Sequence, residues 1–178
     1  MDIVCNYIDG ETPIAGSIAI KDNGTKRRNI GLWISRYLSV GKSEWLVKVD
    51  PDCVITGDIV LPEHADVCGT LTKFKHGIWP LGGAYAIRRE VASKIAAMAR
   101  HPNHRFQCDH YIDRHGMLMP IEEDILSLCG QALGLRFAEW PGANIRYRPY
   151  WQTTEILDTE GFIFHPYVKE HDLDLPTE

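Results

Sequence analysis

The chain has 178 residues and a formal net charge of −5 at pH 7, and its 44% apolar and 24% charged residues are ordinary for one globular domain with a sizeable core. The negative balance argues against a general nucleic-acid binder, which would carry a basic excess. No apolar run approaches the roughly 18 residues that span a bilayer, and the first residues lack the basic-then-apolar order of a signal peptide. The five cysteines include no Cys-x-x-Cys pair, which predicts reduced thiols in a cytoplasmic protein.

The first part of the chain is predicted to form two short strands, a helix and a third strand. The strands cover residues 3–8 and 17–20, with turn-forming residues between them. A helix follows from Lys26 to Gly41, with one apolar face made of Ile30, Trp33, Ile34, Tyr37 and Leu38. The apolar run 45–49 is then predicted to be a buried strand. This strand–helix–strand order is typical of a parallel sheet.

The remainder of the chain continues the alternation of strands and helices. We expect two extended pieces around Pro62 within residues 58–72, a strand near 84–87 that leads into a helix over 89–100, and a polar, irregular segment over 101–116. A third helix opens at residues 120–124 and ends at Gly134, and two strands follow over 136–140 and 145–147, before the apolar stretch 162–164. The pattern predicts a single α/β domain over residues 1–178.

Asp50-Pro51-Asp52 directly follows the predicted strand 45–49. Pro51 cannot continue a ladder of hydrogen bonds, so two carboxylates emerge together at the carboxyl end of a strand. In an open α/β sheet this edge is where ligands bind, and hard oxygen ligands there suit Mg²⁺ or Mn²⁺ that also holds a substrate's phosphates. The alternative is an ordinary Asp-Pro turn with no ligand.

Two later positions each have a structural and a chemical interpretation. Glu122-Glu123-Asp124 begins the third helix, where carboxylates are favoured by the helix dipole, yet one of them could face a cleft and act as a general base. His165 lies between Phe164 and Pro166, where it is either a hydrogen-bonded core residue or a ligand that completes a metal site begun by Asp52.

Two weaker motifs could meet a substrate. Trp79 stands before Gly82 and Gly83, which we expect to form a bend ahead of a strand; the glycines allow close backbone approach, and the indole is either stacked on a sugar or part of the core. Lys26 and Arg27 stand where the first helix begins, and they either meet phosphates or form a solvated, charged turn.

A histidine-rich segment raises the possibility of zinc. Its spacing fits no common zinc finger or ribbon, which pairs two short ligand hooks, so we favour an acceptor-facing loop. The residues are His101, His104, Cys108, His110 and His115.

In this order, the motifs resemble metal-dependent glycosyltransferases of the GT-A fold, nearest to the galactosyltransferase and Fringe-like branch. The resemblance covers residues 21–165. It is carried by four stretches, each with the residue types and the order that the family shows: Glu44-Trp45-Leu46-Val47-Lys48-Val49-Asp50-Pro51-Asp52, then Trp79-Pro80-Leu81-Gly82-Gly83-Ala84-Tyr85, then Glu123-Asp124 with Gly134-Leu135-Arg136-Phe137, and His165 at the end.

The resemblance implies a GT-A-like, Rossmann-like fold with a mixed, mostly parallel sheet flanked by helices. Only 49 residues precede Asp50, so the N-terminal nucleotide-binding part is abbreviated relative to the family. The expected activity is transfer of a sugar from a nucleotide-sugar donor, most simply a UDP-sugar, to an acceptor hydroxyl on a glycan, protein, lipid or modified nucleic acid.

Roles for individual residues follow from the same resemblance. Asp52 and His165 would ligate Mn²⁺ (or Mg²⁺), and Asp50 would contact the nucleotide ribose or the metal. Gly82 and Gly83 would line the donor and acceptor cleft. Asp124 would be the base that deprotonates the acceptor, positioned by Glu123. Direct displacement with one base predicts inversion at the anomeric carbon.

Two alternatives remain at the level of sequence. A sugar-phosphate nucleotidyltransferase would need a Gly-rich loop with Lys or Arg near its N-terminus, and residues 1–16 contain none. A catalytically silent module that binds a sugar nucleotide or a partner has no need for the combination of Asp50, Asp52, Asp124 and His165.

Overall fold

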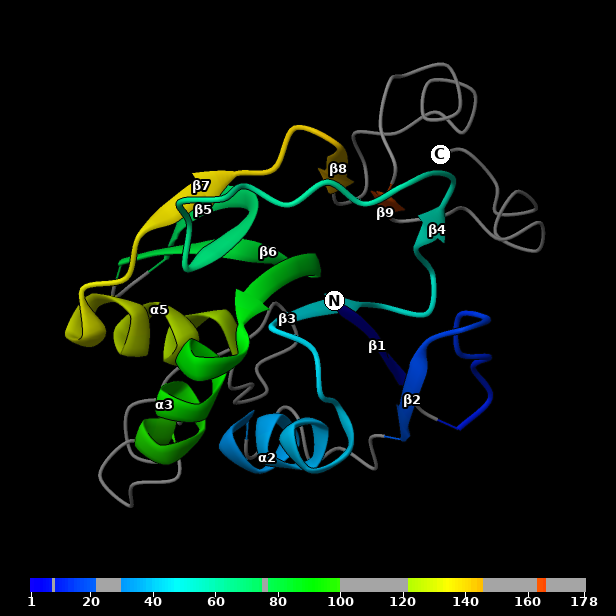
Figure 1. Cartoon of the computed structure of the whole chain (residues 1–178), viewed down its shortest axis with the longest axis horizontal. Coiled ribbons are helices and arrows are strands. Elements are labelled where there is room, and N and C mark those ends of the chain that lie inside the picture. Colours follow the sequence, from blue (N-terminus) through cyan, green and yellow to red (C-terminus); the bar gives the residue numbers. More distant parts are fainter. Residues whose placement is uncertain (8, 22–29, 75–76, 100–121, 146–162, 166–178) are drawn as a thin grey trace, which may run out of the picture.

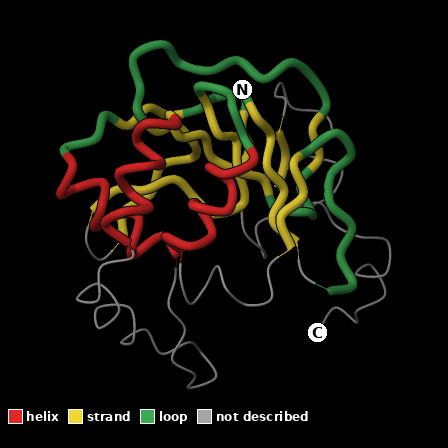
Figure 2. The backbone as a smooth tube through the Cα atoms, turned by 60° about the horizontal axis from the view of Figure 1, so that its bottom comes forward, coloured by secondary structure: helices red, strands yellow, loops and turns green. Residues whose placement is uncertain are grey.

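The computed structural model describes residues 1–7, 9–21, 30–74, 77–99, 122–145 and 163–165, arranged as a mixed sheet with helices on one side (Figures 1 and 2). The helices are α2 (Ile30–Val40), α3 (Arg89–Ala99) and α5 (Glu122–Leu133). The strands are β1 (Asp2–Tyr7), β2 (Ile18–Lys21), β3 (Trp45–Val49), β4 (Val54–Ile55), β5 (Val67–Phe74), β6 (Gly77–Arg88), β7 (Phe137–Glu139), β8 (Ala143–Ile145) and β9 (Ile163–His165).

The strands form two sheets. The larger has the order β2-β1-β3-β6-β5-β7, in which β1 is parallel to β2 and β3, and β5 is parallel to β7. Strand β6 runs antiparallel to both of its neighbours, β3 and β5. The smaller sheet has the order β4-β9-β8. The prediction of a mixed α/β sheet flanked by helices is therefore confirmed for the part of the chain that is described.

The central strand β3 lies between β1 and β6, and all five of its residues are buried. Its alternate side chains enter two different cores, because successive residues of a strand point to opposite faces. Leu46 packs with the helix residues Trp33, Ile34 and Ile95. Trp45, Val47 and Val49 face the other way and pack with Trp140 and its neighbours.

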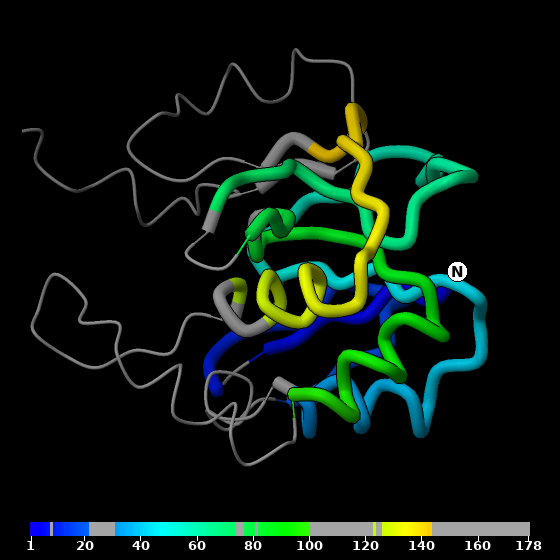
Figure 3. Tube along the Cα trace, turned by 90° about the vertical axis from the view of Figure 1, so that its left-hand side faces the viewer, coloured from blue at the N-terminus to red at the C-terminus, as the bar shows by residue number. Residues whose placement is uncertain are grey.

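The second face of the sheet is covered by the segment between β3 and β5 and by the small sheet. In Figure 3, α2 and α3 lie at the bottom and β8 lies at the top, on opposite sides of the large sheet. The Trp140 indole N–H donates to the carbonyl oxygen of Val60 at 2.7 Å, which ties this covering segment to the end of β7. The result is a three-layer arrangement around β3.

Strand β6 contains a large bulge that the sequence did not predict. Gly69 of β5 pairs with Tyr85, while Leu71 pairs with Pro80, so four residues of β6 (81–84) stand opposite the single residue Thr70. Bulges are where a strand accommodates proline and glycine; Gly82 and Gly83 lie within this one, and Pro80 stands at its border. The segment that we expected to be a bend before a strand is therefore part of a twelve-residue strand.

Most of the other predicted elements are found with small shifts in their ends, but of the two extended pieces expected around Pro62 only the second is a strand, β5, and β4 was not predicted. The three helices and the strand 45–49 are confirmed, and β8 begins two residues before the predicted strand 145–147. Cys5, Cys53, Cys68 and Cys129 are buried free thiols, while Cys108 lies outside the described residues. Within the described ranges, no helix is long and apolar enough to cross a membrane.

An ion pair at the start of β5 provides a test of the fold. The Asp66 carboxylate accepts hydrogen bonds from Arg136 through the backbone N at 2.9 Å, Nε at 3.1 Å and Nη2 at 2.9 Å. The hydrogen bond from the Arg136 side chain is the main cause that lowers the pKa of Asp66, and burial opposes it. The pair joins β5 to β7 at their amino ends.

We predict that Asp66→Asn lowers the free energy of unfolding by about 1 kcal/mol at pH 7, because solvent screens the largely exposed Arg136. A depressed pKa in the folded state means that the contribution is complete above the ordinary aspartate pKa of about 3.9 and is lost as the pH falls through the lower, folded value. Urea unfolding at pH 7 and near pH 3 should show the difference shrink at the acidic pH. Asp58→Asn, at an exposed position, is the control, and an equal loss in both variants would contradict the prediction.

Candidate functional site

The acidic pair lies where the sequence places it, at the carboxyl end of β3. Strand β1 is parallel to β3 with Cys5 opposite Val49, so both strands end at this edge of the sheet. The chain turns at Pro51, and the backbone N–H of Cys53 donates to the carbonyl oxygen of Asp50 at 3.0 Å. The Asp50 side chain is 28% exposed, and Asp52 is also partly exposed. This geometry is what we expect both for an ordinary Asp-Pro turn and for a ligand-binding site, so it does not distinguish the two interpretations of Asp50-Pro51-Asp52.

Lys48 is a buried cation next to the acidic pair, with no role predicted from the sequence. Its side chain is 0% exposed, and its Nζ lies 2.5 Å from Oδ1 of Asp50. Nζ also donates to the carbonyl oxygen of Gly82 and lies 5.5 Å from the centre of the Tyr85 ring. Burying an ammonium costs several kcal/mol unless it is paired, so these contacts explain how the lysine is tolerated. The sequence feature that could have revealed Lys48 is the presence of a lysine within the strand 45–49, which was predicted to be buried.

The glycine pair contacts the acidic turn directly. The backbone N–H of Asp50 donates to the carbonyl oxygen of Gly83 at 2.8 Å, and the Cys53 thiol lies 3.2 Å from the same oxygen. The bond from Asp50 to Gly83 continues the antiparallel register of β3 and β6 by one residue beyond Val49 and Ala84. Burial raises the pKa of Cys53 well above its usual range, and the Asp50 carboxylate adds to the effect, so the thiol stays protonated and donates. Asp50, Gly82 and Gly83 are thus brought together.

Strand β9 brings His165 alongside the residues that follow Asp52. β4 and β9 are antiparallel, with Val54 opposite Phe164 and Ile55 opposite Ile163. Continuing this register by one residue places the backbone of His165 opposite Cys53, the neighbour of Asp52. The His165 side chain is outside the described part, and among the side chains that are described no three His, Cys, Asp or Glu residues converge as metal ligands.

Helix α5 begins at the same edge of the sheet. It packs along β6, where the carbonyl oxygen of Ser127 lies near Gly77, the first residue of that strand. Because β6 is antiparallel to β3, Gly77 lies beyond the carboxyl end of β3, and Glu123 precedes Ser127 by one helical turn. Glu123 is 9% exposed, and the Asp124 side chain is not among those described.

Trp79 is not available to a sugar, contrary to the prediction that it lines the donor or acceptor site. Its side chain is 0% exposed in the core between the sheet and the helices. Its ring makes edge contacts with Tyr85 and Phe137, with ring centres 6.0 and 5.7 Å apart. The indole lies on the helix-facing side of β6 and fills the space above Gly130. Of the two interpretations, the structure supports the core one.

Two other groups of predicted residues fall outside the described ranges. Lys26 and Arg27, proposed to meet phosphates, lie in the segment 22–29. The histidine-rich segment that was weighed against zinc lies within 100–121.

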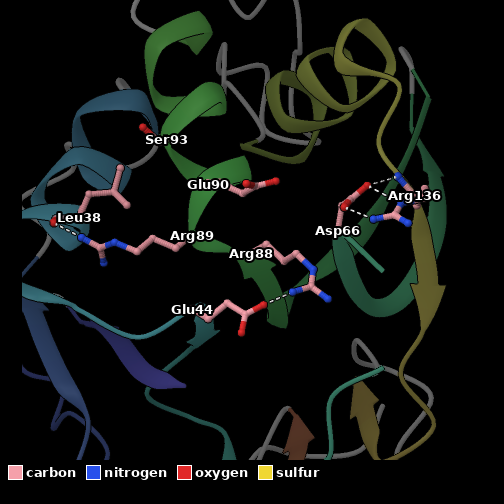
Figure 4. Close-up of a pocket in the computed structure, with 8 residues that line it drawn as sticks. All are labelled: Leu38, Glu44, Asp66, Arg88, Arg89, Glu90, Ser93 and Arg136. Atoms are coloured by element: carbon pink, nitrogen blue, oxygen red, sulfur yellow. Dashed lines mark hydrogen bonds and ion pairs between the residues drawn. The ribbon is translucent and has the colours of Figure 1, made fainter. Parts of the chain in front are cut away.

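A cavity of about 710 Å³ lies at the opposite edge of the sheet (Figure 4). It is lined by three arginines and three carboxylates, and its charges balance; the lining residues are Leu38, Glu44, Asp66, Arg88, Arg89, Glu90, Ser93 and Arg136. The arginines are occupied in joining elements: Arg88 pairs with Glu44, Arg136 pairs with Asp66, and Arg89 donates to the carbonyl oxygen of Leu38 at 2.7 Å. We interpret this cavity as structural, because the predicted chemistry lies at the other edge.

No protein-family model matches the chain, and no curated protein matches its sequence.

The buried position of Trp79 gives a prediction that distinguishes a role in the hydrophobic core from a role in sugar binding. Trp79→Ala should lower the free energy of unfolding by about 3–5 kcal/mol, as expected for a large side chain removed from a core. Ile78→Ala is the matched control on the same strand, because that side chain is 50% exposed and should cost well under half as much. Urea unfolding measures both. Full stability of Trp79→Ala together with weaker ligand binding would restore the sugar-stacking interpretation.

Proposed function

We propose that this chain is a metal-dependent glycosyltransferase that moves a sugar from a nucleotide-sugar donor to an acceptor hydroxyl. The observation that carries the proposal is the pairing of β4 with β9, which sets the backbone of His165 beside the residue after Asp52. Two residues far apart in the sequence, expected from the resemblance to share one metal ion, are thus brought near each other: His165 ends β9, and Asp52 lies two residues before its partner strand β4.

The arrangement of the sheet supports the same proposal. The acidic pair follows the central strand, and the Gly82-Gly83 bulge and the start of α5 lie at the same edge. Ligands of open α/β sheets bind at the carboxyl ends of the parallel strands. A mixed sheet of this kind is compatible with a GT-A-like fold, in which this edge would receive the nucleotide and the sugar.

The donor atoms at this edge fit a divalent cation. Asp52 supplies a partly exposed carboxylate and His165 would supply an imidazole, a combination of oxygen and nitrogen ligands that suits Mn²⁺ better than Mg²⁺. The ion would act as a Lewis acid that offsets negative charge on the departing nucleoside diphosphate.

The remaining roles belong to the chain's own residues. Asp50 would bind the nucleotide ribose with its exposed side, since one of its oxygens is held by Lys48. The Gly82-Gly83 segment, expected from the resemblance to line the donor cleft, is buried, and its role would be to hold Asp50 in place through the Gly83 carbonyl group. Asp124, positioned by Glu123, would take the proton of the acceptor hydroxyl as its oxygen bonds to the anomeric carbon and the bond to the diphosphate breaks. A single displacement of this kind inverts the anomeric configuration.

We predict that Mn²⁺ increases the stabilisation that UDP or GDP gives the chain against thermal unfolding. A ligand at 100 times its Kd adds about 2.7 kcal/mol of stability. Asp52→Asn should lose the part of the stabilisation that depends on metal, whereas Asp58→Asn, at an exposed position in the loop after β4, should keep it. Stabilisation that is the same with and without metal would contradict the proposed site.

A second measurement separates an enzyme from a silent binding module. Glycosyltransferases slowly hydrolyse their donor when water replaces the acceptor, so we expect Mn²⁺-dependent release of UDP from a UDP-sugar. Asp52→Asn should abolish this release, and Asp58→Asn should not change it. Metal-dependent binding of UDP without release from any of a panel of UDP- and GDP-sugars would favour the binding module.

A further inference from the structure

Lys48 places a full positive charge in the protein interior, in contact with the first carboxylate of the acidic pair. It stands two residues before Asp50 on β3, so both side chains point to the same face of the sheet. The ammonium is 0% exposed and lies 2.5 Å from Oδ1 of Asp50. Water therefore screens this charge little, and its influence extends to whatever binds at the end of the strand.

The lysine cannot itself touch a ligand. Its Nζ is enclosed by Asp50, which directly follows β3, and by the carbonyl oxygen of Gly82 and the ring of Tyr85 on β6. Its effect on a ligand must pass through the Asp50 carboxylate and through the electrostatic field. Lys48 is accordingly a positioning residue and a source of charge.

We propose that Lys48 is a built-in counter-ion that makes the acidic pair a poor site for a bare divalent cation and a good one for a cation carried with a diphosphate. Asp50 and Asp52 together offer two negative charges, and Lys48 offsets one of them. A cation alone meets a site of reduced charge, while an anionic diphosphate is repelled less than it would be by two uncompensated carboxylates. This inference rests on the proposed function, since it concerns the same metal and diphosphate.

The signs of the expected effects separate this role from a merely structural one. Removing the lysine charge should tighten the binding of bare Mn²⁺ and weaken the binding of metal-free UDP. A residue that only supported the local fold would weaken both when it is replaced. The two ligands can be measured independently, without any enzymatic activity: Mn²⁺ by the electron paramagnetic resonance signal of the unbound ion, and UDP by calorimetry in the presence of a chelator.

The experiment compares wild type, Lys48→Met and the double variant Lys48→Met/Asp50→Asn. Lys48→Met should bind Mn²⁺ at least tenfold more tightly than wild type, and UDP several-fold more weakly, because one unit charge a few ångströms away has at least this effect on a divalent ion even when water screens it. The double variant removes both charges and restores the net charge of the site, so its Mn²⁺ affinity should return to within about threefold of wild type. Lys42→Met, an exposed lysine before the amino end of β3, is the control and should change neither affinity.

Each outcome decides the question. Weaker or unchanged Mn²⁺ binding by a folded Lys48→Met variant overturns the inference and leaves the proposed function standing. If Lys48→Met does not fold, as judged by circular dichroism, the double variant decides: a loss of more than tenfold in its Mn²⁺ affinity would make Asp50 a direct ligand and would also overturn the inference. If the wild-type protein does not bind Mn²⁺ and UDP together, the proposed function is contradicted. In that case the inference about Lys48 survives only if Lys48→Met binds Mn²⁺ more tightly than wild type; otherwise it is overturned as well.

Discussion

The ion pair between Lys48 and Asp50 is the interaction on which the proposed site depends. It holds a buried cation in the central strand, fixes one oxygen of the first carboxylate and, through the carbonyl oxygen of Gly82, attaches β6 to the end of β3. Without a partner a charge in this position would cost several kcal/mol, so the strand, the bulge and the acidic turn are stable only together. The same contacts that hold the fold therefore set the geometry of the carboxylates.

The two edges of the sheet have different roles. At the carboxyl end of β3, the carboxylates of Asp50 and Asp52 are partly exposed, which suits binding, while Gly82 and Gly83 beside them are buried and support the turn. At the opposite edge, arginines and carboxylates neutralise one another across the ends of β3, β5, β6 and β7. A cavity lies at that second edge, yet cavity size alone is a poor guide here, because four of its six charged lining residues already form ion pairs: Arg88 with Glu44, and Arg136 with Asp66.

The places where sequence reasoning failed share a physical cause. Pro80, Gly82 and Gly83 have the composition of a bend, and only pairing with two neighbouring strands turns them into a bulge within β6. Trp79 has the chemistry of a sugar-binding residue, and only the packing of α5 and β7 against β6 places it in the core. Lys48 was missed because a lysine in a strand is normally exposed. In each case contacts from distant parts of the chain decided the outcome.

The sequence by itself determined the local features: a buried strand over residues 45–49, a stop at Pro51 with a carboxylate on either side, and three amphipathic helices. These follow from periodicity and turn chemistry, which act between neighbours along the chain. Only the tertiary structure decided what meets at the end of that strand, namely the glycine bulge, the start of α5 and the strand of His165. Strand order and register arise from burial and pairing between distant segments, and no local pattern specifies them.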